Sequence, residues 1–145
     1  MRINELVELI IKKYQTRNPF EIAKKRNAII VHAPLIDIRG FYQYFQRNNI
    51  IYINENLSDS EKIFVCAHEL GHMIMHKDTN AVYMDTKTFL NTTKCEKEAN
   101  IFAAELLIPD EIILENWNYT TEQLSQLLGY EQALIELRLK SYHEI

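Results

Sequence analysis

A buried helix is expected over the stretch Ile63-Phe-Val-Cys-Ala-His-Glu-Leu-Gly-His-Met-Ile-Met75, which contains the pattern H-E-x-x-H. Residues four apart lie one above the other on one face of a helix. His68 and His72 can therefore bind a single zinc ion without bending the backbone. Glu69 points to the side of this pair, where it can reach a metal-bound water and act as a general base. The flanking residues are apolar, and buried histidines need a partner, which favours a metal site over two histidines placed by chance.

The sequence also indicates where this helix begins and what lies at its other end. Ser58-Asp-Ser-Glu61 is a capping box, with a hydroxyl at the N-cap and a glutamate three residues later. His76 follows His72 by four residues, but it lies about 12 Å from His68 by helical rise. Three histidines in a row along one helix cannot surround a single ion. We therefore expect His76 to be a cation at the helix C-terminus or a group that contacts a ligand.

A catalytic zinc site needs a third protein ligand and leaves a fourth position for water. The candidates lie in a predicted helix at residues 95–107, which Pro109 ends. Glu96 is the first choice, because it shares a helix face with Asn100, whose amide can orient a histidine. Glu98 is the second choice, because it points to a different face. The alternative for either acid is an ordinary solvated helix surface.

Two cysteines, Cys66 and Cys95, lie near these predicted ligands. Zinc binds thiolate well, so both remain alternative ligands. Cys66 is two residues from His68 and should face away from it, and a buried core thiol is the favoured interpretation. His32 is expected in a strand rather than at the metal. The few cysteines and the lack of an export signal predict a reducing, cytoplasmic location.

The rest of the chain predicts an α+β fold with a small sheet packed on the metal-site helices. Periodic apolar residues indicate helices at 3–14, 20–26, 110–116, 121–128 and 131–142. Runs rich in β-branched and aromatic residues indicate strands at 28–32, 36–46 and 50–53, with a tight turn at Asn48-Asn49 between the last two. Gly40 is expected at a bulge or turn, and residues 77–93 as a loop with at most a little strand. We expect about three strands, in an antiparallel or mixed sheet.

Length and composition are consistent with one domain over residues 1–145. The chain has a hydrophobic fraction of 47% and a net charge of −4, which argues against nucleic acid as a partner. No apolar run is long enough to span a membrane. We expect a core over about residues 1–115 and a C-terminal helical hairpin over about 116–145. That hairpin has helix-turn-helix proportions, but its acidic residues indicate a packing or docking element rather than a DNA reader.

Two motifs together resemble the ImmA/IrrE family of zinc metallopeptidases. The first is His68-Glu-Leu-Gly-His72, and the second is the run E-x-x-A-N-x-F-A-x-x-L-L-x-P from Glu96 to Pro109. The resemblance extends over about residues 1–115. It implies a minimal zincin-like core with three short strands, metal ligands at His68, His72 and Glu96, and catalysis by Glu69.

The same resemblance implies a function. Members of this family are often encoded on phages and mobile elements, and several cleave a repressor that has a helix-turn-helix domain. We therefore predict a zinc metalloendopeptidase that cleaves one specific protein partner, a repressor from a neighbouring gene. Tyr83 and His76 are the candidates for stabilising the oxyanion. The alternative is a stress-response or toxin–antitoxin regulator that binds a protein or DNA partner without general proteolysis.

Overall fold

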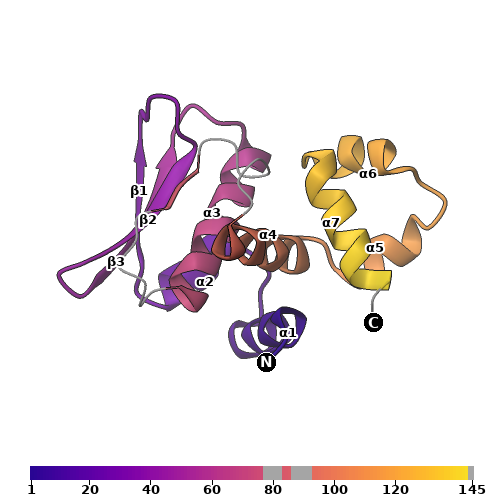
Figure 1. Ribbon diagram of the computed structural model, residues 1–145, viewed down its shortest axis with the longest axis horizontal. Helices are drawn as coiled ribbons and strands as arrows, with labels where there is room; N and C mark the ends of the chain where they lie inside the picture. Colours follow the sequence, from indigo (N-terminus) through magenta and orange to yellow (C-terminus); the bar gives the residue numbers. More distant parts are fainter. Residues whose placement is uncertain (77–82, 86–92, 144–145) are drawn as a thin grey trace.

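The computed structural model describes residues 1–76, 83–85 and 93–143, with only the backbone at 83–85. Within these ranges the chain has an α+β fold, as predicted (Figure 1). The helices are α1 (Ile3–Tyr14), α2 (Pro19–Lys25), α3 (Asp59–Met75), α4 (Lys94–Leu107), α5 (Asp110–Glu115), α6 (Thr121–Leu128) and α7 (Gln132–His143). The strands are β1 (Ile29–Ala33), β2 (Gly40–Phe45), β3 (Asn48–Asn54) and β4 (Tyr83–Asp85).

The strands form one small mixed sheet in the order β1-β3-β2-β4. Strand β3 pairs with β1 in parallel and with β2 in an antiparallel hairpin. The short strand β4 adds to the other edge of β2 and comes from the stretch expected as a loop. One face of the sheet packs on α3, and α4 crosses α3 on the side away from the sheet (Figure 1). This arrangement places α3 at the centre of the molecule.

The β2–β3 hairpin differs from the prediction at both of its ends. The tight turn is at Gln46 and Arg47, whose φ angles are 49° and 66°, and Asn48 already pairs with Phe45 inside the ladder. Our prediction of a turn at Asn48-Asn49 was therefore wrong. The register buries alternate residues of both strands against α3, and this burial outweighs the local preference of asparagine for turns. Strand β2 also begins later than predicted, because Asp37 has a φ of 58°, which no strand accepts.

Gly40 is the first residue of β2 rather than a bulge or turn. A Cβ atom at this position would lie 2.6 Å from Val65 Cγ1 on α3 and 2.5 Å from the Tyr52 carbonyl oxygen. Both separations are too short for any side chain. The absence of a side chain at Gly40 therefore lets the sheet approach the central helix closely.

The C-terminal hairpin, α6 and α7, packs against the rest of the protein through α7 and α4. Gly129 ends α6 in the left-handed conformation, with φ of 81°, as expected for a helix C-cap. Arg138 on α7 is buried, and its Nε donates a 2.7 Å hydrogen bond to the Ile108 carbonyl. Its guanidinium also contacts Asp110 and lies 3.8 Å from Glu105. The hairpin is thus anchored to the end of α4, as a packing element would be.

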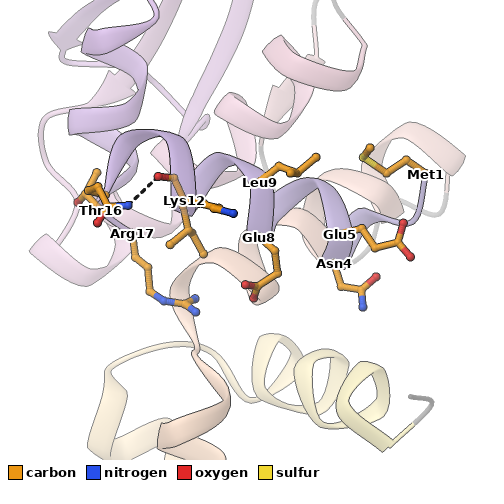
Figure 2. A pocket seen from close by; sticks show the side chains of 10 residues that line it. Met1, Asn4, Glu5, Glu8, Leu9, Lys12, Thr16 and Arg17 are labelled. Atoms are coloured by element: carbon orange, nitrogen blue, oxygen red, sulfur yellow. Dashed lines mark hydrogen bonds between the residues drawn. The ribbon is translucent and has the colours of Figure 1, made fainter.

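The N-terminal helix α1 also packs on α4, and a hollow of about 810 Å³ lies beside it (Figure 2). The hollow is lined by side chains between Met1 and Arg17, and the Gln15 amide donates a 2.7 Å hydrogen bond to the Lys12 carbonyl there. None of the predicted site residues lines it.

Among the described residues, no helix has the length and apolarity needed to cross a bilayer.

Candidate metal centre

Both helices that carry the predicted ligands begin at well-formed caps. At the start of α3, Ser58 Oγ accepts a hydrogen bond from the Glu61 amide, and the Glu61 carboxylate accepts one from the Ser58 amide, each at 3.3 Å. The predicted capping box is therefore confirmed. At the start of α4, Thr93 Oγ1 accepts a 3.3 Å hydrogen bond from the Glu96 amide. This cap fixes the first turn of α4, which is the turn that presents Glu96 to α3.

Small residues let α4 approach α3 closely at the level of the histidines. Ala99 and Ala103 on α4 are fully buried. A Cβ atom at Gly71 on α3 would lie only 3.1–3.2 Å from the side chain of Phe102. The two helices therefore bring their side chains into direct contact without a spacer between them.

His68, His72 and Glu96 meet at this contact, and we call them the primary centre. Glu96 Oε2 lies 3.0 Å from His68 Nε2, and Glu96 Oε1 lies 2.6 Å from His72 Nε2. One ligand atom from each residue lies within 4.8 Å of the other two. The exposed fractions are 0% for both histidines and 3% for Glu96. Three buried side chains thus direct two nitrogens and a carboxylate at one point, which is the donor set of a catalytic zinc site.

The electrostatics of the primary centre keep these groups ready to bind a cation. Burial alone would raise the pKa of Glu96, but hydrogen bonds and charge interactions with His68 and His72 outweigh it and lower the pKa to about 2. Burial lowers the pKa of His72 below its usual value of 6.5, although Glu96 opposes that shift. At neutral pH the centre therefore holds an ionised carboxylate and a neutral imidazole, which are the forms that bind metal.

Two buried polar atoms near the primary centre also fit a bound ion. His68 Nδ1 and Asn100 Oδ1 are both buried, and neither has a hydrogen-bond partner among the described residues. An ion held by His68 Nε2 would fix the ring proton on Nδ1 as a donor. Asn100 lies one helical turn after Glu96 on α4 and offers an acceptor. The residues present therefore fit a metal, but Asn100 and His68 are not hydrogen-bonded to each other, so the predicted orientation of a histidine by Asn100 is not seen.

Glu69 lies beside the primary centre rather than within it. It is fully buried, and its Oε1 lies 4.0 Å from His68 Nε2. The carboxylate therefore faces the nitrogen that would bind the ion. This is the position expected for a group that exchanges a proton with a water at the metal.

The other predicted site residues lie at different places. His76 and Glu98 are outside the primary centre: His76 Nδ1 lies 2.9 Å from His72 Nδ1, and His76 Nε2 lies 3.1 Å from Glu98 Oε1. His76 therefore contacts a predicted ligand, which was one of the two expectations for it, whereas its contact with Glu98 was not predicted from the sequence. The side chain of Tyr83 lies outside the described residues. His32 is exposed and stacks on Phe20.

The two cysteines differ in their surroundings. Cys66 belongs to the hydrophobic core, where burial and the nearby Glu69 carboxylate raise the pKa of its thiol. Cys95 is half-buried near the start of α4 and lies close to His76 and Glu98. We call His76, Cys95 and Glu98 the second cluster. Only Cys66 has the surroundings expected of a core thiol.

A buried His-His-Glu group with an adjacent glutamate, held between two helices beside a small mixed sheet, defines a metallopeptidase-type fold and site. The sequence profile described as "IrrE N-terminal-like domain" (Peptidase_M78) matches residues 23–140, and the chain belongs to this family. It is 40% identical over 139 residues to "Uncharacterized immunity region protein 2" of Bacillus phage phi105, which covers 94% of this chain and 88% of that protein. It is also 33% identical over 143 residues to "Metallopeptidase ImmA" of Bacillus subtilis (strain 168). This match covers 94% of this chain and 83% of that protein.

Proposed function

We propose that this protein is a zinc metallopeptidase in which His68, His72 and Glu96 hold one zinc ion and Glu69 is the general base. The observation that carries the proposal is the primary centre itself: two imidazole nitrogens and a carboxylate converge in a buried position, with the Glu69 carboxylate 4.0 Å from His68 Nε2. Membership of the Peptidase_M78 family supports the same activity.

Zinc is the metal that best suits these ligands. Two neutral imidazoles and one carboxylate are a common donor set for catalytic zinc, and they leave the fourth position for water or substrate. When bound, zinc supplies a Lewis acid that lowers the pKa of water to about 7 and polarises a peptide carbonyl.

The remaining steps belong to the chain's own residues. A Glu69 carboxylate oxygen accepts the proton of the attacking water and then delivers it to the nitrogen of the leaving amine. Asn100 Oδ1 and His68 Nδ1 are not hydrogen-bonded to each other in the structure, so no role in orienting His68 is assigned to Asn100. His76 Nδ1 accepts from the Nδ1–H of His72, and Glu98 accepts from the other nitrogen of His76, which fixes the second imidazole.

The proposed substrate is a specific protein, a repressor with a helix-turn-helix domain encoded by a neighbouring gene. Similarity to a phage immunity-region protein and to a metallopeptidase named ImmA supports a role in phage or mobile-element immunity. A site enclosed within the fold also suits a selective peptidase better than a general one, because few peptide segments can reach it.

Replacing Glu69 with glutamine tests the mechanism directly. Glu69→Gln removes the base but keeps its shape, so it should retain stoichiometric zinc and lose at least about 10²–10⁴-fold in cleavage rate. The matched control is Glu122→Gln, an equivalent change at an exposed position on α6. Zinc content and cleavage of the neighbouring repressor would be measured for all three proteins. Cleavage by Glu69→Gln at the wild-type rate would contradict the mechanism. Zinc in every protein with tight repressor binding but no cleavage would instead indicate a regulator that sequesters its partner.

A further inference from the structure

The second cluster lies where the end of α3 meets the first turns of α4. His76 is the residue that ends α3, and Cys95 and Glu98 are close to the start of α4. His76 Nε2 lies 3.1 Å from Glu98 Oε1, and one ligand atom from each of the three residues lies within 4.8 Å of the other two. His76 is buried, whereas Cys95 and Glu98 are half-buried. The cluster is therefore more accessible to solvent than the primary centre.

These three side chains form a donor set for a second metal ion. Imidazole, thiolate and carboxylate are each ordinary zinc ligands, and thiolate selects zinc over magnesium or calcium. Ligand atoms bound to a tetrahedral zinc ion lie about 3.3–3.8 Å from one another, so side-chain adjustments of about 1 Å would close the cluster on an ion. We propose that His76, Cys95 and Glu98 form a second zinc site of lower affinity than the primary centre. Zinc bound at either site weakens zinc binding at the other, and we call this effect the opposition between the sites.

The opposition follows from the contact between the two histidines. His72 Nδ1 and His76 Nδ1 are 2.9 Å apart, and only one of the two nitrogens can carry a hydrogen there. An ion on His72 Nε2 leaves the hydrogen on His72 Nδ1, so His76 must keep its own hydrogen on Nε2, where it donates to Glu98. An ion can bind His76 Nε2 only when that nitrogen carries no hydrogen. Each ion therefore favours the hydrogen arrangement that disfavours the other.

This coupling gives the second site a role. Excess zinc at the second cluster weakens zinc binding at the primary centre and lowers its activity, a consequence that rests on the proposed peptidase function. The binding site itself does not depend on that function, because its ligands are defined by the contacts above. Binding and activity can therefore be tested separately.

Cobalt(II) distinguishes the two sites, because a cobalt–thiolate bond has a charge-transfer absorption in the near ultraviolet and only the second cluster contains a thiol. Reduced full-length protein would be titrated with cobalt in the presence of a non-coordinating phosphine reductant. We expect visible ligand-field absorption first and thiolate absorption only in molar excess of cobalt. Cys95→Ser should abolish the thiolate absorption, and Cys66→Ser, the matched control, should retain it. Glu98→Gln keeps the thiol but removes a carboxylate ligand, so its thiolate absorption should appear only at a higher cobalt concentration.

The opposition makes a sharper prediction for a protein without a functional primary centre. His68→Ala removes one primary ligand but leaves the contact between His72 and His76 intact. Its thiolate absorption should appear at a cobalt concentration at least about tenfold lower than in the wild type. Tenfold is the lower end of the change in metal affinity that is typical when the hydrogen-bond partner of a ligand is altered. A midpoint equal to that of the wild type would overturn the coupling.

The remaining outcomes are also decisive. No thiolate absorption in the wild type at large cobalt excess, or absorption that survives Cys95→Ser in a protein with native circular dichroism, would overturn the second site. In cleavage assays, excess zinc should inhibit the wild type more than Cys95→Ser, and equal inhibition of the two proteins would overturn the regulatory role. If neither protein cleaves the repressor at any zinc concentration while the thiolate absorption is present, the proposed function fails and the second site stands.

Discussion

The primary centre and the second cluster are built from the same two helices and lie about one turn apart along α3. Each combines histidine from α3 with glutamate from α4. They differ in depth: the three ligands of the primary centre are at most 3% exposed, whereas the Glu98 side chain of the second cluster is 32% exposed. They also differ in their ligands, because the second cluster replaces one histidine with Cys95.

This difference shows how depth assigns separate roles to similar residues. The ligands of the primary centre are shielded from bulk solvent, and the Glu96 carboxylate interacts with two imidazoles at 2.6 and 3.0 Å. At the second cluster, solvent screens Glu98 and competes for any cation. The same residue types therefore favour a tightly held ion at one end of the α3–α4 contact and a weakly held one at the other.

Replacing Glu96 or Glu98 with glutamine, one at a time, should give the largest difference in zinc affinity. Glu96→Gln removes a direct ligand, so zinc affinity should fall by more than the roughly 10–100-fold typical of an outer-shell change, and cleavage should be lost with it. Glu98→Gln is the matched control on the same helix and should weaken zinc binding by no more than about tenfold. Competition with a chromogenic chelator measures both affinities. Equal losses in the two variants would contradict the assignment of Glu96 as the ligand.

Removing His76 should have an intermediate effect on the primary centre. His76→Ala deletes the group that contacts His72 Nδ1, and the loss of such an outer partner typically costs 10–100-fold in metal affinity. His32→Ala, at an exposed histidine on β1, is the control and should bind zinc like the wild type. The zinc affinities of His76→Ala, His32→Ala and the wild type would be compared at one equivalent of zinc. An unchanged value in His76→Ala would show that the contact does not orient His72.

Loosening the C-terminal hairpin should have the smallest effect on metal binding. Arg138→Ala removes the hydrogen bond to the Ile108 carbonyl and leaves the carboxylates of Glu105 and Asp110 without their buried cation. The free energy of unfolding should fall by about 3 kcal/mol, measured by urea denaturation. Zinc affinity should stay within a few-fold of the wild type, because Arg138 contacts the end of α4, whereas Glu96 lies in its first turn. Lys140→Ala, at an exposed position on α7, should change neither quantity.

Loss of zinc binding in Arg138→Ala at temperatures where the protein remains folded would contradict this separation. It would mean that the hairpin fixes the position of α4 relative to α3, and not only the stability of the fold. The metal-free and zinc-loaded forms should be compared in the same denaturation experiment, since bound zinc itself adds stability.

The parts of the fold that follow from local signals were predictable from the sequence. The capping box at Ser58 fixed the start of α3, and Pro109 marked the end of α4. The apolar flanks of the H-E-x-x-H pattern showed that α3 would be buried. Glu96 could be predicted as the third ligand across a gap of more than 20 residues, because it shares a helix face with Asn100 in the helix that carries the second motif.

The parts that depend on long-range pairing were not predictable. The parallel pairing of β1 with β3 and the turn at Gln46 and Arg47 follow from how the sheet packs on α3, which no local preference reports. The second cluster depends on the position of the first turn of α4 beside His76. From the sequence, Glu98 was assigned to another helix face and Cys95 was left as an alternative ligand, because their meeting with His76 requires the observed crossing of the two helices.

X-ray absorption at the zinc edge shows directly which side chains hold the first zinc ion. With one equivalent of zinc, we expect only nitrogen and oxygen neighbours, at about 2.0–2.2 Å, because the ion lies in the primary centre. With a second equivalent, a sulfur neighbour at about 2.3 Å should appear in the wild type and not in Cys95→Ser. A sulfur neighbour already present at one equivalent would contradict the account, because it would place the first zinc ion at Cys95 rather than between His68, His72 and Glu96.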